Sequence, residues 1–209
     1  MRIRPALRAL LLCLLFALPA GCGQTPSLVH QYVFEYPPPP SPGAARNPQA
    51  ITVKRFAAAQ DFTTTDMVYR PAPLQRATYR YHRWRVEPGA LVADYLARDL
   101  RHAQVFTAVF TGPETEQSRY RLEGGVEEIQ EIDGPVTWQA ALALVVTLLD
   151  LQEEEVTKRV VFQKRYRSEE TMTAQTPQGL AEAMSRNMAR LSREIISDLA
   201  RAVSRRPPL

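Results

Sequence analysis

The chain has 209 residues, of which 45% are hydrophobic, and it carries 26 Lys and Arg against 22 Asp and Glu. This length suits one domain with a substantial hydrophobic core. Three of the arginines lie near the N-terminus in a segment that we expect to be removed. The rest of the chain is therefore close to neutral, and the formal charge of +4 does not indicate a nucleic-acid partner.

Residues 1–21 have the parts of a bacterial export signal. Arg2, Arg4 and Arg8 supply positive charge, and residues 9–18 form a run of ten apolar residues. This run is too short to cross a hydrocarbon core of about 30 Å as a permanent helix. We therefore interpret the segment as a signal peptide that is cleaved after export.

The signal ends at a cysteine in the position where bacterial lipoproteins are cleaved and acylated. The small pair Ala20 and Gly21 precedes Cys22, although Pro19 stands where such motifs usually carry Leu. An ordinary signal peptide cut nearby remains the alternative. Cys13 lies inside the signal, so an unmodified Cys22 would be a lone thiol in an oxidising compartment. We expect Cys22 to carry N-palmitoyl and S-diacylglycerol groups, and we expect no other cofactor.

The expected domain organisation follows from this cleavage point. Residues 22–31 are predicted to be a lipidated tether, residues 32–204 one folded domain and residues 205–209 a flexible tail. The residue after the cysteine is Gly23, not the Asp that retains many lipoproteins in the inner membrane. We therefore expect anchoring at the periplasmic face of the outer membrane.

Short alternating runs of aromatic and branched residues predict strands in the first half of the domain. A Pro-rich loop is expected at residues 37–50, and the strand at 79–86 is expected at a sheet edge or exposed. A helix is predicted from Pro88 to about His102, because proline suits a first turn and apolar residues recur on one face. The predicted strands are residues 32–36, 51–56, 67–70, 79–86 and 105–110.

A long hairpin is predicted next. Its strands are residues 120–132 and 136–150, joined by a turn at 133–135. The second strand is apolar on both faces, so we expect it to be central and covered. A returning strand is predicted at 156–167, after an acidic tip at 153–155 that is more typical of a solvated turn than of a metal site.

A late helix is predicted to start with Thr176 as its cap and Pro177 in its first turn. An apolar stripe indicates that the helix packs on the sheet, although a methionine-lined lipid groove is an alternative. The stripe consists of Leu180, Met184, Met188, Leu191, Ile195 and Leu199. These elements together predict an α/β (α+β) single domain, with a mixed, largely antiparallel β-sheet packed by two main helices.

The sequence offers no recognisable catalytic or metal-binding motif. An arginine-rich and aromatic strand is the one unusual polar feature, with Arg80, Arg83, Trp84 and Arg85 as candidate contacts to lipid head groups or to a partner protein. The alternative is that this is an ordinary polar strand without a binding role, whose aromatic residues pack on the core. The export signal argues against nucleic acid as a partner. We predict that the protein is not an enzyme.

The order of these motifs after the candidate lipidation site resembles the ABC-type transport auxiliary lipoprotein family, which includes the paraquat-inducible protein C-like lipoproteins. The resemblance is carried by residues 67–70, 83–88, 106–109 and 120–124, by the strand at 138–150 and by the late helix. It implies a mixed α/β domain without catalytic residues. It also implies partners: a periplasmic MCE-domain protein and the inner-membrane ABC and permease subunits of a lipid transport system.

Two hypotheses follow from the sequence. The first is a lipid-anchored accessory of an ABC/MCE-type transporter that moves phospholipids between the inner and outer membranes. The second is a scaffold or pilot lipoprotein that assembles an envelope complex without binding lipid. Self-association is a further expectation, because an exposed strand edge favours it.

Overall fold

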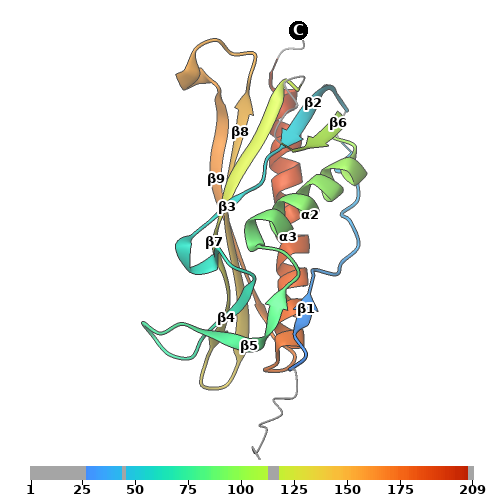
Figure 1. Ribbon diagram of the computed structural model, residues 1–209. Helices are drawn as coiled ribbons and strands as arrows, with labels where there is room; N and C mark the ends of the chain where they lie inside the picture. Colours follow the sequence, from blue (N-terminus) through green and yellow to red (C-terminus); the bar gives the residue numbers. More distant parts are fainter. Residues whose placement is uncertain (1–26, 44–45, 113–117, 207–209) are drawn as a thin grey trace, which may run out of the picture.

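A computed structural model describes residues 27–43, 46–112 and 118–206 (Figure 1). Within these residues one mixed β-sheet of nine strands curls around two helices and forms a single α+β domain, as the sequence predicted. The strands are β1 (His30–Tyr32), β2 (Asn47–Val53), β3 (Ala57–Ala58), β4 (Asp66–Arg70), β5 (Ala77–Trp84), β6 (Phe106–Thr111), β7 (Tyr120–Asp133), β8 (Trp138–Asp150) and β9 (Val160–Thr171). The helices are α2 (Pro88–Ala103) and α3 (Pro177–Ser204), with single 3-10 turns η1 (Gln60–Phe62) and η2 (Val156–Lys158).

Strand β7 is the spine of the sheet. On one side it pairs with β8 in antiparallel fashion along its whole length, and β8 pairs with β9. On the other side three short strands, β2, β3 and β4, align in turn along β7, all parallel to it. The sheet then extends from β4 through β5 to β1 at one end, and from β2 to β6 at the other.

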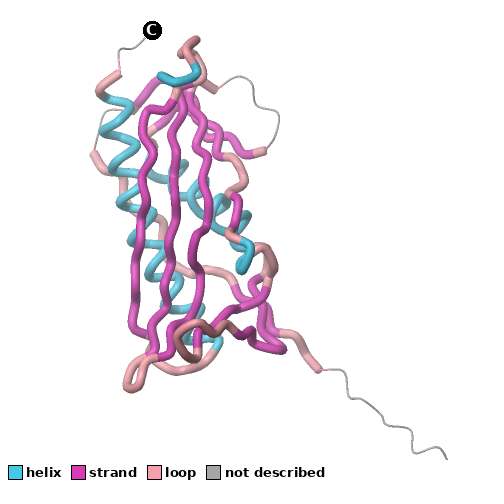
Figure 2. The backbone as a smooth tube through the Cα atoms, turned by 90° about the vertical axis from the view of Figure 1, so that its left-hand side faces the viewer, coloured by secondary structure: helices cyan, strands magenta, loops and turns pink. Residues whose placement is uncertain are grey.

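Helix α3 lies along the inner face of the long strands, and α2 lies beside it (Figures 1 and 2). The first turn of α3 is capped as predicted, because the Thr176 hydroxyl accepts a hydrogen bond from the Gly179 amide at 3.0 Å. The predicted apolar stripe is buried in the core, and Met184 and Met188 are fully buried among the residues that fill the space between α3 and the sheet. The methionine-lined groove that the sequence allowed is therefore absent from this described helix.

Helix α2 begins at Pro88, as predicted, and its next residue is Gly89. A Cβ atom on Gly89 would lie 2.1 Å from the Phe56 carbonyl oxygen, so the glycine allows the helix to approach the chain between β2 and β3. The helix ends with Gln104 in the left-handed conformation, at φ 55°. This close approach holds the first turn of α2 against the middle of the sheet.

The outer face of the long strands is not covered by a helix, contrary to the expectation for residues 136–150 (Figure 2). Instead, the small side chain of Ala143 in β8 lies between Glu128 of β7 and Arg167 of β9 in the strand register. The Arg167 guanidinium reaches across it to the Glu128 carboxylate, with 3.0 Å between Nε and Oε2. Long charged side chains of the flanking strands thus shield the apolar outer face of β8.

Several predicted boundaries were wrong. Residues 33–36 are not part of a strand: β1 ends at Tyr32, and Phe34 and Tyr36 pack against the helices instead. Strand β2 starts at Asn47, inside the predicted Pro-rich loop, and tolerates Pro48 because the register shifts between Asn47 and Ala50. Strand β8 begins at Trp138, not at 136, and residues 156–158 form a 3-10 turn before β9.

Candidate functional site

Residues 33–36, here called the strap, connect β1 to the rest of the domain and cross the two helices. The Phe34 side chain is only 2% exposed and packs against Tyr95 of α2, with 5.2 Å between the ring centroids. The Tyr95 hydroxyl donates a hydrogen bond to the Phe34 carbonyl, and the Glu35 amide donates one to the Ser185 hydroxyl of α3 at 2.9 Å. The strap is therefore fixed to both helices by its backbone as well as by its side chains.

A buried carboxylate holds the end of the strap. Asp99 of α2 is fully buried, and its Oδ2 atom accepts hydrogen bonds from the Tyr36 hydroxyl at 2.7 Å and from the Ser192 hydroxyl of α3 at 2.6 Å. Its Oδ1 atom accepts one from Nε of Arg98 at 2.8 Å. Burial, reinforced by the Asp99 charge, raises the pKa of Tyr36 well above its usual value, so the phenol remains a neutral donor. One carboxylate thus joins the strap, α2 and α3.

The Arg98 guanidinium completes this cluster. It lies over the rings of Tyr36 and Tyr95, at 4.4 Å and 4.6 Å from their centroids. The positive charge therefore compensates Asp99 and also covers two aromatic residues from the solvent side. Sequence reasoning missed this cluster, although one signal was present: Asp99 occupies a position in line with the predicted apolar face of α2.

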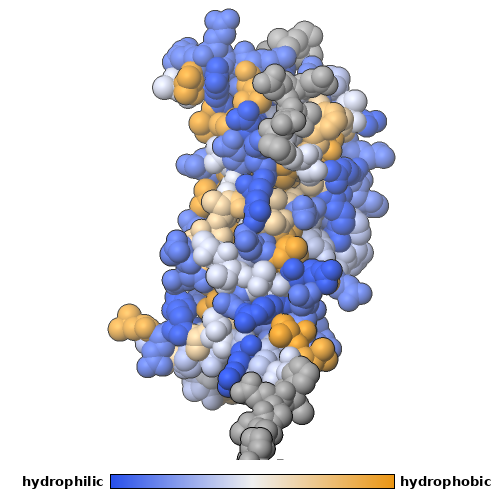
Figure 3. All heavy atoms as spheres, in the orientation of Figure 1, coloured by the Kyte–Doolittle hydropathy of each residue, from blue (hydrophilic) through white to orange (hydrophobic). Residues whose placement is uncertain are grey.

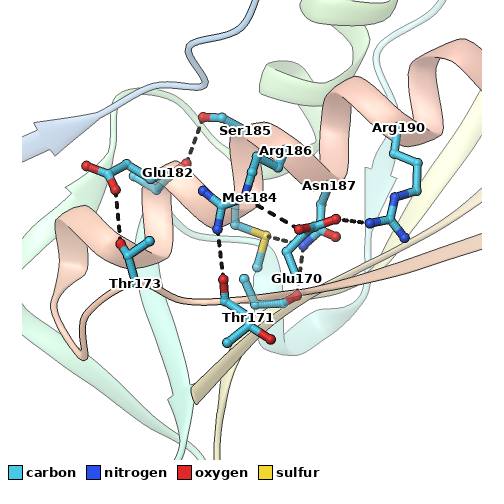
Figure 4. Close-up of polar contacts among 11 residues, drawn as sticks. Glu170, Thr171, Thr173, Glu182, Met184, Ser185, Arg186, Asn187 and Arg190 are labelled. Atoms are coloured by element: carbon cyan, nitrogen blue, oxygen red, sulfur yellow. Dashed lines mark hydrogen bonds and ion pairs between the residues drawn. The ribbon is translucent and has the colours of Figure 1, made fainter. Parts of the chain in front are cut away.

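Polar contacts also fasten the first half of α3 to the sheet (Figure 4). Arg186 donates to the Thr171 carbonyl at 2.8 Å, Glu170 pairs with both Arg186 and Arg190, and Asn187 donates to the Ala140 carbonyl at 2.7 Å. Beside these contacts, an open groove of about 680 Å³ runs between the strap and α3. Its lining includes Val33, Tyr36, Ala181, Ser185, Arg186 and Ala189.

The candidate contact residues in and just after β5 are not equally available at the surface. Arg80 is exposed, whereas Arg83 is half-buried and forms an ion pair with Asp66 of β4. Arg85 is exposed and donates to the Gln31 side chain at 2.7 Å. Strand β1 pairs only with residues 82–84, the last three residues of β5. The earlier part of β5 has no described strand on that side and much of its surface is exposed, as expected for an edge or exposed strand.

Trp84 differs from the other three candidates. Its side chain is 1% exposed and packs edge-on against Phe34 of the strap, with 5.5 Å between the ring centroids. A residue in this position belongs to the core and has no surface to offer to a head group. For Trp84 the alternative of a core residue without a binding role is thus correct, because the strap covers its side chain.

The N-terminal segment enters the molecule at one end, which we call the tether end. It consists of residues 27–29, the β4–β5 turn at 71–76 and the β7–β8 turn at 134–137, which lie at the same end of the molecule in both views (Figures 1 and 2). Hydrophobic side chains are exposed there (Figure 3). The most exposed are Leu28, Leu74 and Val136, at 74%, 103% and 80%.

Strand β7 carries a second buried carboxylate close to the tether end. Glu131 is fully buried and accepts a hydrogen bond from the Tyr79 hydroxyl of β5 at 2.7 Å. Burial and the neighbouring Asp133 carboxyl raise the pKa of Glu131 to about 7, against the opposing effect of the Tyr79 hydrogen bond. The pair joins β5 to β7 across the short strand β4.

The part of the chain that the structure describes holds no group of three or more His, Cys, Asp or Glu side chains arranged as metal ligands. Within it, neither helix has the length and apolar character needed to span a bilayer. Cys22 and Pro19, on which the lipidation prediction depends, lie outside the described residues.

Three solved structures share this fold. Protein XCC0632 from Xanthomonas campestris is 17% identical, with a TM-score of 0.75 over 84% of this chain and 97% of its own. An uncharacterized protein is 10% identical, with a TM-score of 0.61 over 82% and 99% of the two chains. The hypothetical protein CT253 from Chlamydia trachomatis is 9% identical, with a TM-score of 0.52 over 75% and 98%. Among curated proteins no sequence match is found.

The family comparison covers the strap, α2, most of α3 and the whole sheet except the start of β1. The model of the ABC-type transport auxiliary lipoprotein component matches residues 32–196. This range includes Tyr36, Asp99 and Ser192, which join the strap to the helices. A match over most of the chain, on a fold shared with solved relatives, shows that this protein belongs to the ABC-type transport auxiliary lipoprotein family.

Proposed function

We propose that this protein is a non-enzymatic, lipid-anchored accessory of an ABC/MCE-type transporter that moves phospholipids between the inner and outer membranes. The family match over residues 32–196 is the observation that carries the proposal, because it places the chain among the auxiliary components of ABC-type transport. The partners proposed are a periplasmic MCE-domain protein and the inner-membrane ABC and permease subunits.

The proposed anchor is an acylated Cys22. Three acyl chains, each buried methylene contributing about 0.8 kcal/mol, would hold the domain at a bilayer essentially permanently. The strap supports an anchoring role, since it fixes the chain that leads to Cys22 against both helices. Fractionation of the envelope tests the location: the mature protein should be found with the outer membrane, and recovery with the inner membrane would contradict that half of the proposal.

The partners can be tested by purifying the acylated protein from membranes. Site-specific photo-crosslinkers on the exposed surface should capture an MCE-domain protein or a permease subunit. A crosslinker at Met184 offers a control, because this side chain is fully buried in the core and faces no partner. Crosslinking to neither class of protein from several exposed positions would contradict the proposal.

The scaffold hypothesis has one observation in its favour. The space between α3 and the sheet is filled by buried side chains, so lipid would have to bind on the surface. Mass spectrometry of noncovalent lipid that copurifies with the protein distinguishes the two roles. Bound phospholipid supports a direct part in transport, whereas a lipid-free protein that still captures an envelope partner supports scaffolding.

A further inference from the structure

We propose that the tether end docks on the surface of an anionic phospholipid bilayer, with Leu74 inserted among the lipids and arginines beside it in contact with phosphate groups. This inference rests on the lipid anchor of the proposed function, and it adds a defined orientation of the domain relative to the membrane. Four observations carry it: the conformation of Leu74, the apolar residues near it, the charge of this end and the length of the tether.

Leu74 is fully exposed to solvent, and its backbone conformation is unfavourable for a leucine. Its side chain is 103% exposed, and its backbone has φ 64°, which is in the left-handed region. A bulky residue is unfavourable there, and glycine or asparagine is the usual choice. The turn around it is braced by Pro71 and Pro73 and by a hydrogen bond from the Gln75 amide to the Ala72 carbonyl at 3.2 Å. The turn therefore presents a leucine to the surroundings at its tip.

Other apolar side chains are exposed on the same end. Leu28 is 74% exposed in the segment before β1, and Val136 is 80% exposed in the β7–β8 turn. Both segments lie with the β4–β5 turn at the end from which the N-terminal chain leaves (Figures 1 and 2). Three separate turns or segments at one end of the molecule thus each expose one apolar side chain, an arrangement that suits contact with a membrane interface.

The charged residues beside Leu74 favour an anionic surface. Arg76 and Arg80 are exposed and Arg70 is partly exposed. No carboxylate among the described residues forms an ion pair with these three arginines, in contrast to Arg83, which is paired with Asp66. Arginine binds phosphate oxygens through two parallel hydrogen bonds, and each basic residue near an anionic surface contributes to attraction.

The tether is short enough to bring this end to the bilayer. Only four residues lie between Cys22 and Ser27, the first described residue, so the fully extended distance between these two residues is about 17 Å. Because the anchor holds the domain close to the bilayer, the domain meets the membrane surface at a high effective concentration. Weak contacts are therefore sufficient for docking. The tether end therefore faces the membrane that holds the anchor.

The test uses the acylated mature protein in vesicles, with a single cysteine as a reporter. Acylation occupies Cys22 and Cys13 leaves with the signal, so Leu74→Cys introduces the one free thiol for an environment-sensitive fluorophore. Val136→Cys is a second reporter on the same end. Val156→Cys is the matched control, because Val156 is also an exposed apolar residue, 70% exposed, but lies in the connection between β8 and β9 at the opposite end.

In phosphatidylcholine vesicles that contain phosphatidylglycerol, lipids with brominated acyl chains should quench most of the fluorescence at positions 74 and 136 and none at position 156. Arg76→Glu combined with Arg80→Glu should abolish the quenching, whereas Arg193→Glu on the exposed side of α3 should not. Equal quenching without phosphatidylglycerol would overturn the role of the arginines.

Flotation of the vesicles separates the two proposals. A protein that floats with the vesicles but shows no quenching at positions 74 and 136 would overturn docking and leave the anchor intact. A protein that does not float would overturn the anchor at Cys22, and the docking inference would fail with it.

Discussion

Gln104 closes helix α2 in the left-handed conformation, at φ 55°, where glycine is the favoured residue. Gln104→Gly removes the steric conflict of the Cβ atom, and we expect it to raise the free energy of unfolding by about 1 kcal/mol. Urea unfolding of the two proteins measures the change. Gln104→Ala keeps the Cβ atom and should give no gain, so an equal gain from both substitutions would contradict this reason.

Glu131 makes the stability of the domain depend on pH. Its pKa rises from 4.5 to about 7 on folding, so between these values the native state binds a proton that the unfolded state has released. The free energy of unfolding therefore decreases as the pH rises through this window. Glutamine keeps the acceptor for Tyr79 and never ionises.

We accordingly expect Glu131→Gln to stabilise the domain by roughly 1–3 kcal/mol above pH 7 and to have little effect near pH 4.5. Thermal or urea unfolding across this range provides the measurement. Glu154→Gln removes the same charge from an exposed side chain and serves as the control. If Glu131→Gln raised the free energy of unfolding equally at all pH values, ionisation of Glu131 would not be the cause of the gain.

At the scale of elements, the strap depends on the hydroxyl of Tyr36. Tyr36→Phe removes the hydrogen bond to Asp99 but keeps the ring under Arg98, and we expect a loss of about 1 kcal/mol. Hydrogen exchange should become faster at the Glu35 amide, which the strap holds against Ser185. Tyr81→Phe changes an exposed ring and should leave the exchange of this amide unchanged. Unaltered exchange in Tyr36→Phe would mean that the strap is held without this bond.

The helices could be predicted from sequence because their signals are local. Pro88 and Thr176–Pro177 mark the starts, and apolar residues at three- and four-residue spacing mark the buried faces. The hairpin of β7 and β8 was predicted for the same reason, since a turn joins two long alternating strands. Local patterns therefore gave the fold class and the elements with the longest periodic runs.

The misjudged elements depend on distant partners. Residues 33–36 alternate like a strand, but their apolar face packs on helices that come at least 50 residues later in the chain. The outer face of β8 looks as apolar as a covered strand, but side chains from β7 and β9 shield it. The Asp99 cluster likewise gathers Tyr36 and Ser192 from opposite halves of the chain. No short window of sequence contains such pairings.

At the scale of the whole molecule, the chain ends lie far apart along the long strands. The described N-terminal segment is at the tether end, and α3 ends at the opposite end (Figure 1). There a buried ion pair joins Arg119 to Asp150, with 2.9 Å between Nη2 and Oδ2, and Arg206 adds a second contact to Asp150 at 3.3 Å. If the tether end rests on the membrane, this opposite end extends away from it, toward the partners proposed for the transporter.

The anchor at Cys22 should be required for function but not for folding. The described residues form their own hydrophobic core, so Cys22→Ser should leave the domain folded while it removes the acyl chains. We expect the variant to be recovered in the soluble periplasmic fraction and to lose function. A fully active soluble variant would contradict the role of the anchor.

The most direct test of the central claim is the identity of the proteins bound to the acylated protein in its own envelope. Crosslinked complexes would be purified under denaturing conditions from cells that express the natural protein and from cells that express Cys22→Ser, and identified by mass spectrometry. A lipid-anchored auxiliary component of this family should capture an MCE-domain protein and ABC or permease subunits, and Cys22→Ser should lose them. Recovery of neither class with the acylated protein would contradict the account.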